Sequence, residues 1–152
     1  MPIRSRSKSL TGTNTVKTTL LTTAAMTFAL LQTGSAIALP TPNEDGDYSG
    51  RSRHTTWQVV DVDPNGLNCR MEGSFQDILD DRYNGVDPNI IDMPVVATLE
   101  YGKILEAGTT PAGNVLLGDD RGLPWVYASE PKCFVRANSS FISPISSPEA
   151  IH

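Results

Sequence analysis

Cysteine occurs in only two stretches of the chain, Leu67-Asn68-Cys69-Arg70 and Lys132-Cys133-Phe134-Val135-Arg136. In both stretches apolar and polar residues mix as they do in a half-buried β-strand. The first stretch follows Asp63-Pro64-Asn65-Gly66, whose Pro, Asn and Gly favour a tight turn. We therefore expect two strands, distant in sequence, that lie side by side and are joined by a disulfide between Cys69 and Cys133.

Short runs rich in β-branched and aromatic residues fill most of the chain from Trp57 on. The run Trp57–Val62 is expected to pair with Leu67–Met71 as a hairpin across the turn. The other expected strands are Val95–Ala107, bent or turned at Gly102, then Val115–Leu117, Pro124–Ala128 and Lys132–Arg136. Five to six short strands separated by turns predict an all-β fold, a small closed barrel over residues 56–145.

One segment between these strands favours a helix. Ser74 is a good N-cap residue, and Phe75, Ile78 and Leu79 would share one face of a helix that begins there. Asn84-Gly85 would end it. The segment enlarges the first long loop of the expected barrel.

The first 38 residues have the features of a cleaved export signal. Four basic residues and no acidic ones precede the apolar run Leu20–Leu31, and Ala36-Ile37-Ala38 fits a small-x-small cleavage site. The run is short and contains several threonines, so no membrane anchor is expected after cleavage. Residues 39–55 are polar and predict a flexible linker, and residues 146–152 predict a frayed tail. The expected location is secreted or periplasmic, where disulfides form.

Charge excludes one class of partner. Removal of residues 1–38 takes four of the 12 basic residues and none of the 17 acidic ones, which leaves a net charge of −9. Binding to nucleic acid or to anionic lipid depends on Lys and Arg that neutralise phosphate, and no basic patch is visible. Nucleic acid is therefore not an expected partner.

The sequence offers little for catalysis or for metal binding. Asp61-x-Asp63-x-Asn65-Gly66, followed by Glu72, matches the EF-hand calcium loop, but strands are predicted where an EF-hand needs helices, so no calcium is expected. Two cysteines without a neighbouring histidine do not make a zinc site. An envelope hydrolase that uses the adjacent carboxylates Asp80 and Asp81, or Asp119 and Asp120, is an alternative, but such pairs are usually solvated and a glycosidase needs carboxylates on opposite sides of a cleft. We expect no enzyme activity and no cofactor.

Several segments from Trp57 to Ile142 resemble the bacterial SH3-like (SH3b) domain. Leu67-Asn68-Cys69-Arg70 is similar to the Leu-Asn-Val-Arg strand of that family, with cysteine in place of valine. The segment around Gly102 resembles its Gly-centred middle strands, and Trp125 with Val126 and Ala128 resembles its Trp strand. The resemblance implies a non-catalytic module of envelope proteins that binds peptidoglycan or a peptide.

Three aromatic residues are the expected ligand-binding site. Alternation in the run Pro124–Ala128 places Trp125 and Tyr127 on one face of a strand and smaller residues on the other. If the smaller pair faces the barrel interior, the two rings form an outward platform that Tyr83 reaches from the enlarged loop. Such a platform would bind peptidoglycan or an envelope peptide. A half-buried Trp125 in the barrel wall and a secreted inhibitor or protein-interaction domain are the alternatives.

Overall fold

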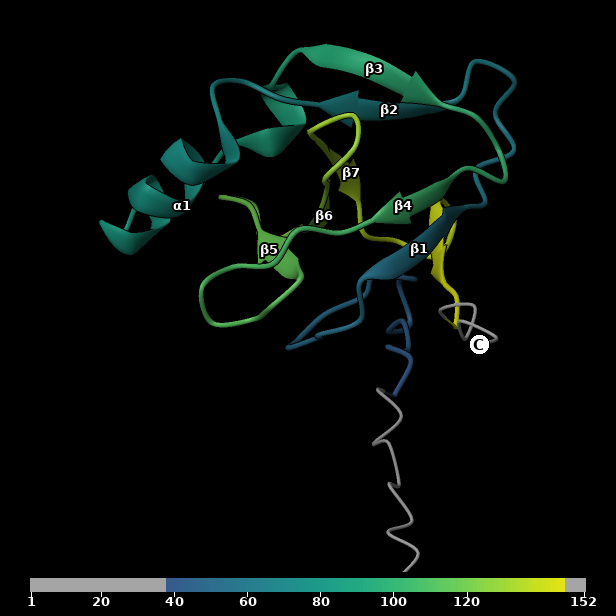
Figure 1. The fold of residues 1–152 in the computed structure, drawn as a ribbon, viewed down its shortest axis with the longest axis horizontal. Helices are drawn as coiled ribbons and strands as arrows, with labels where there is room; N and C mark the ends of the chain where they lie inside the picture. The colour runs from purple at the N-terminus through teal and green to yellow at the C-terminus, as the bar shows by residue number, and fades with distance from the viewer. Residues whose placement is uncertain (1–37, 147–152) are drawn as a thin grey trace, which may run out of the picture. The chain divides into compact units, whose positions relative to one another are not determined.

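The computed structural model describes residues 38–146. The expected export signal, apart from its last residue Ala38, and the expected frayed tail from residue 147 on lie outside the described residues. The described part is mostly β and contains two antiparallel sheets and one α-helix (Figure 1).

The smaller sheet has three strands in the order β4-β1-β8. Strand β1 (Thr56–Val59) lies between β4 (Ile104–Glu106) and β8 (Ile142–Pro144), with Trp57 opposite Leu105 on one side and Pro144 on the other. Both Trp57 and Val59 are fully buried. The last strand, β8, was not expected from the sequence.

The larger sheet has five strands in the order β3-β2-β7-β6-β5. Its strands are β2 (Leu67–Arg70), β3 (Val95–Leu99), β5 (Leu116–Gly118), β6 (Pro124–Ala128) and β7 (Cys133–Arg136). The two sheets do not close into the expected barrel. An isolated bridge between Ala107 and Ala128 links them beyond the end of β4.

The expected hairpin between β1 and β2 is wrong, because the two strands lie in different sheets. After β1 the amides of Val60 and Asp61 donate to the carbonyl of Phe141 at 2.8 and 3.2 Å, which holds the chain beside the later strand β8. After the turn at Gly66, β2 pairs with β3 and β7. The turn sequence reverses the chain, but it does not determine which strands pair.

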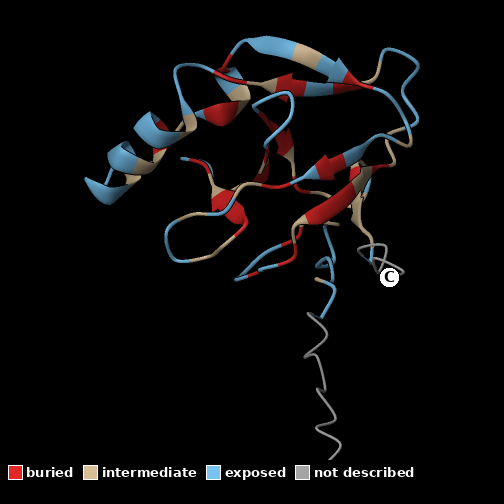
Figure 2. Ribbon diagram, viewed as in Figure 1, coloured by how far each residue is buried: buried red, intermediate tan, exposed pale blue. Residues whose placement is uncertain are grey.

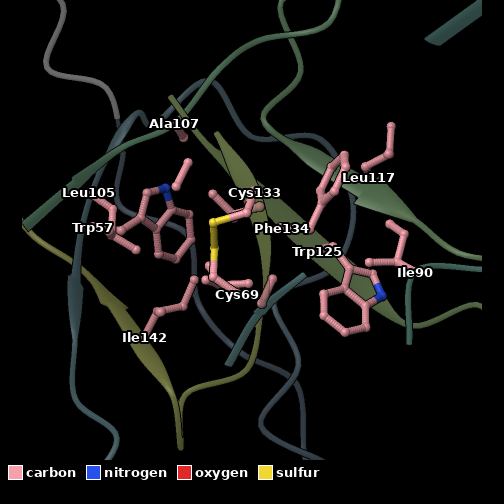
Figure 3. Packing of buried hydrophobic residues seen from close by; sticks show 14 of the residues in the cluster. Trp57, Cys69, Ile90, Leu105, Ala107, Leu117, Trp125, Cys133, Phe134 and Ile142 are labelled. Atoms are coloured by element: carbon pink, nitrogen blue, oxygen red, sulfur yellow. A yellow bond between two sulfur atoms is a disulfide. The ribbon is translucent and has the colours of Figure 1, made fainter. Parts of the chain in front are cut away.

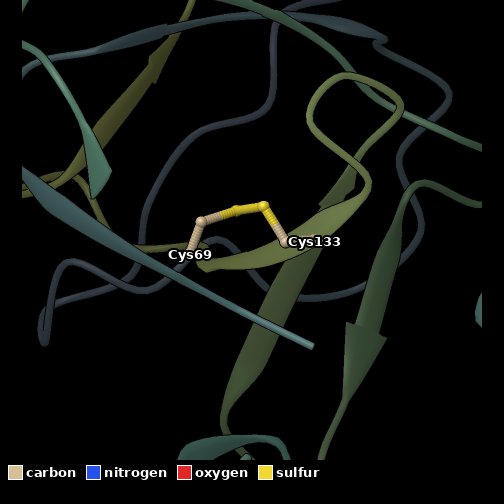
Figure 4. The surroundings of a disulfide bond; sticks show 2 residues. All are labelled: Cys69 and Cys133. Atoms are coloured by element: carbon tan, nitrogen blue, oxygen red, sulfur yellow. A yellow bond between two sulfur atoms is a disulfide. The ribbon is translucent and has the colours of Figure 1, made fainter. Parts of the chain in front are cut away.

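The two cysteines are joined as predicted. Arg70 of β2 pairs with Phe134 of β7, and the neighbouring residues Cys69 and Cys133 form a disulfide with Cα atoms 5.4 Å apart (Figure 4). Both cysteines are fully buried. On the chain-entropy model a cross-link that spans 64 residues stabilises the folded state by about 4 kcal/mol.

Helix α1 (Phe75–Tyr83) begins where the sequence predicts. The Ser74 hydroxyl accepts a hydrogen bond from the Asp77 amide at 3.1 Å, and the Asp77 carboxylate accepts one from the Ser74 amide, which completes a capping box. A 3-10 turn, η1 (Ile90–Asp92), follows before β3. Figure 2 shows that most of α1 is exposed, whereas Ile78 and Ile90 are buried.

The core lies on both faces of the larger sheet. One side contains the disulfide with Trp57, Leu105 and Ile142, and the other contains Phe134 and Trp125 (Figure 3). Residues from α1 and η1 cover this second side, and Ile90 lies near Trp125 there. The segment that the sequence suggests as an enlarged loop therefore covers a sheet face.

The segment expected to be a flexible linker, residues 39–55, lies against the domain. Tyr48 is buried, and its ring meets the edge of Trp57 at a centroid distance of 5.0 Å. His54 is also buried, and its Nε2 donates to the Thr56 carbonyl at 2.6 Å. Arg136 holds the segment by an ion pair of 2.8 Å to Asp47. Buried Tyr48 and His54, together with the ion pair of Asp47, hold this otherwise polar segment against the domain.

Candidate functional site

Trp125, the first of the three predicted ligand-binding aromatics, is part of the core. Only 2 % of its surface is exposed. Its indole N–H donates to the Asp119 carboxylate at 2.9 Å, and the Arg136 guanidinium lies over the ring, 5.9 Å from its centroid. The ring therefore cannot serve as an outward platform in this structure, and the alternative of a packing role describes it better.

Tyr127, the second, is half-buried beneath the start of α1. Its ring stacks on Phe75 with a centroid distance of 4.1 Å and an interplanar angle of 1°, and Phe134 lies beside both rings. Burial raises the pKa of the Tyr127 hydroxyl above its usual value of 10.0. This stack anchors the helix to the sheet, so one face of Tyr127 is already occupied.

Tyr83, the third, is 93 % exposed at the last residue of α1. It lies eight residues beyond Phe75, which corresponds to roughly 12 Å along a helix. The three aromatics therefore do not form one surface. The alternation that assigned Trp125 and Tyr127 to the same face was correct, but α1 and η1 cover that face.

Tyr83 instead borders a hollow of about 480 Å³ between α1, the loop before β5 and β5 itself, within the usual size range of ligand sites. We call it the α1 groove. Its walls are formed by Arg51, Gln76, Leu79, Asp80, Arg82, Tyr83, Thr110, Pro111, Ala112, Asn114, Leu116 and Leu117.

Apolar residues line the α1 groove from three elements. Leu79 comes from the helix, Pro111 from the loop, and Leu116 and Leu117 from β5. Exposed Tyr83 adds a ring that loses little conformational entropy on binding. The groove thus offers apolar contact area beside a few polar groups, the usual chemistry of a site for a small ligand or a short peptide.

Side chains hold the edge strand β5, which lines the groove. Arg82 donates to the Gly118 carbonyl and also lies 3.2 Å from Asp87. The side-chain amide of Asn114 donates to the Leu116 carbonyl at 2.7 Å. Because two carbonyls of β5 already have side-chain partners, this edge is protected against pairing with another strand, and a ligand would meet side chains rather than open backbone.

Sequence reasoning did not find the α1 groove. Its members come from the expected linker (Arg51), the helix (Leu79) and the loop after β4 (Pro111), and no periodic pattern connects these segments. The available signal was local: Leu79 and Tyr83 lie four residues apart, so they share a side of the predicted helix. The opposing wall depends on how the loop folds back.

The calcium-like pattern lies in the connection between two strands. The Asp61 carboxylate accepts from the Asp63 amide at 3.0 Å, and the Asp63 carboxylate accepts from the Asn65 amide at 2.9 Å. These are ordinary turn contacts of Asp side chains. Within residues 38–146, no group of three or more His, Cys, Asp or Glu residues is arranged to hold a metal ion.

No helix among residues 38–146 is both long and apolar enough to cross a membrane. Comparisons of the chain with protein-family models, with curated proteins and with solved structures found no match.

Proposed function

We propose that this protein is an exported, non-catalytic binding module, related to SH3-like domains, that recognises cell-wall peptidoglycan or an envelope peptide through the α1 groove. The observation that carries the proposal is the groove itself, with apolar residues among its lining and the exposed ring of Tyr83 at its rim. An exposed aromatic beside an apolar hollow is a typical anchor for a peptide or for the face of a sugar.

Two further observations support the proposal. The buried disulfide between Cys69 and Cys133 is compatible with an oxidising compartment outside the cytoplasm. Carboxylates are the other candidates for chemistry, but Asp80 and Asp81 are exposed neighbours on one helix rather than an opposed pair across a cleft. A binding role therefore fits the residues better than a hydrolytic one.

Co-sedimentation of the purified protein with purified peptidoglycan tests the proposal. Tyr83→Ala should lower the affinity about tenfold, the usual loss on removal of an aromatic anchor. Because Tyr83 is 93 % exposed, the substitution should leave the fold intact. Tyr101→Ala is the matched control, because Tyr101 is also exposed but lies outside the α1 groove.

Equal effects of the two substitutions would exclude the α1 groove as the binding site. If the wild-type protein does not sediment with peptidoglycan under any condition, the wall-binding function is wrong. A soluble envelope protein retained by the wild type and lost by Tyr83→Ala would then identify a protein-interaction domain.

A further inference from the structure

Arg51 lies where two hollows of the surface meet. The first is the α1 groove, and the second, of about 530 Å³, lies beside the same loop and is lined in part by Pro40, Ser49 and Arg53. Arg51, Ala112 and Asn114 line both hollows. A ligand that extends from the α1 groove past the loop must therefore pass the Arg51 side chain.

The charge of Arg51 is not neutralised within the described part of the chain. Arg82, Arg121 and Arg136 each form an ion pair with an aspartate, whereas among residues 38–146 Arg51 has no carboxylate oxygen within 4.0 Å. The chain from residue 39 on has a net charge of −9. Among residues 38–146, Arg53 and Arg70 also lack a carboxylate partner, but neither of them lines the α1 groove. Arg51 is thus the unpaired guanidinium of the groove, and its planar fork of donors matches a carboxylate.

The backbone beside Arg51 is held in place. The amide of buried Ser52 donates to the Asn114 side chain at 2.9 Å, and the Ser52 carbonyl accepts from the Val115 amide at 2.8 Å. Asn114 is fixed in turn by its bond to the Leu116 carbonyl. The root of the Arg51 side chain is therefore positioned before a ligand arrives, which lowers the entropic cost of binding.

The opposite wall of the α1 groove restricts where an anionic ligand group can lie. Asp80 lines the helix side, and its carboxylate accepts a hydrogen bond from the side-chain amide of Gln76 at 2.8 Å. Its negative charge would repel a ligand carboxylate placed along the helix. Arg82, the other cation of the groove, is already engaged by the Gly118 carbonyl and by Asp87. Within the groove, the Arg51 end is therefore the favourable place for a single carboxylate.

We propose that Arg51 binds the C-terminal carboxylate of a short peptide whose apolar side chains occupy the α1 groove. The inference rests on the proposed function, because it assigns a ligand class and an orientation to the same groove. Arg51 then selects a peptide by its free C-terminal carboxylate and not by a charged side chain along the peptide.

An NMR titration tests this inference with two probes, N-acetyl-dialanine with a free carboxylate and the same peptide as a C-terminal amide. The free acid should bind the wild-type protein about fivefold more tightly than the amide, as expected for one exposed charge-assisted contact. Arg51→Gln should remove this difference. Arg53→Gln is the matched control, because Arg53 lines only the second hollow, and it should keep the difference.

Equal binding of the two probes, or a preference for the acid that survives in Arg51→Gln, would overturn the role of Arg51. If both probes then still shift the amide signals of Leu79 and Leu117, the α1 groove remains a binding site and only the carboxylate inference fails. If the acid shifts the signals around Arg51 alone, Arg51 binds a carboxylate, but the peptide does not occupy the α1 groove, so the proposed orientation and the groove function both fail. No shift with either probe at about 10 mM, where even millimolar affinity saturates, overturns the inference, and co-sedimentation with peptidoglycan then decides the proposed function independently.

Discussion

Trp125 donates its indole N–H to Asp119 at 2.9 Å, and both residues are buried. The same carboxylate accepts from the backbone amides of Arg121 and Leu123 at 3.0 and 2.8 Å. The Asp119 carboxylate thus accepts hydrogen bonds from the turn between β5 and β6 and also from the indole of Trp125, the largest ring on that side of the core. This relationship makes Trp125 a structural residue and not a surface for ligands.

Replacement of Asp119 should therefore be costly. Asp119→Ala leaves the indole N–H and two turn amides without their acceptor, and we expect the free energy of unfolding to fall by about 3 kcal/mol. Asp120→Ala is the matched control, because Asp120 is exposed, and it should change stability by less than about 0.5 kcal/mol. Urea denaturation followed by tryptophan fluorescence measures both values. Similar losses for the two variants would contradict the role assigned to Asp119.

Removal of the disulfide should lower stability more than any single surface change. Replacement of Cys69 and Cys133 together by alanine, at a link that spans 64 residues, should reduce the free energy of unfolding by about 4 kcal/mol on the chain-entropy model. Denaturation of the double variant beside the oxidised wild type gives the difference. Non-reducing peptide mapping of the purified protein checks the bond directly, and recovery of two alkylatable thiols would contradict it.

Asp47 should make the stability depend on pH in acid. Burial raises its pKa, but hydrogen bonds from Asn138 and Arg136 and the charge of Arg136 outweigh burial and hold the pKa below its usual value of 3.8. Because the folded-state pKa is lowered, the stabilisation by Asp47 is present above about pH 4 and is lost as the pH falls through the folded-state pKa. Asp47→Asn should therefore cost about 1 kcal/mol at pH 7 and progressively less below pH 4.

Urea denaturation at pH 7 and at pH 3 measures this cost, and the control is a variant with the same change of charge at an unpaired site. Asp45→Asn is that control, because Asp45 is exposed and lies two residues from Asp47. It should change the free energy of unfolding little at either pH. A cost of Asp47→Asn that stays constant from pH 7 to pH 3 would contradict the assignment.

Gly108 should not tolerate a side chain. A Cβ atom at Gly108 would lie 2.8 Å from Cδ1 of Tyr127, and the Tyr127 ring is already stacked on Phe75. Gly108→Ala should therefore destabilise the protein by about 2 kcal/mol, the usual cost of overpacking. Gly118→Ala is the control, because a Cβ there meets nothing within 4 Å. Thermal unfolding compares the melting temperatures of Gly108→Ala and Gly118→Ala. Equal values would show that the stack of Tyr127 on Phe75 can shift without loss of stability, which would contradict the prediction.

Local signals in the sequence were sufficient for several elements. The Ser74 cap and the spacing of Phe75, Ile78 and Leu79 predicted α1, because capping and helical periodicity act within one turn of the chain. The two cysteines predicted the pairing of β2 with β7, because export favours a disulfide and a disulfide brings distant segments together. These predictions depended on few residues and on no knowledge of the remaining contacts.

Predictions that required knowledge of distant partners were less successful. Alternation correctly placed Trp125 and Tyr127 on one face, but periodicity does not say what covers a face, and α1 with η1 covers this one. The segment from 39 to 55 was expected to be flexible from its composition, but Tyr48 packs on Trp57 and Asp47 pairs with Arg136, far along the chain. The α1 groove could not be predicted, since its walls come from segments that meet only in the folded chain.

The central position of β7 has a consequence for the timing of folding. β7 lies between β2 and β6 in the larger sheet, and β8, later still, completes the smaller sheet beside β1. A chain that emerges from the ribosome one residue at a time therefore cannot complete either sheet until nearly all of the domain has been made. Until then β2 and β6 each lack a neighbour, and such unpaired edges attract other chains. The larger sheet of the nascent protein can therefore form only after β7, its middle strand, has been synthesised. Any truncation before Cys133 removes this strand, which joins the two halves of the larger sheet.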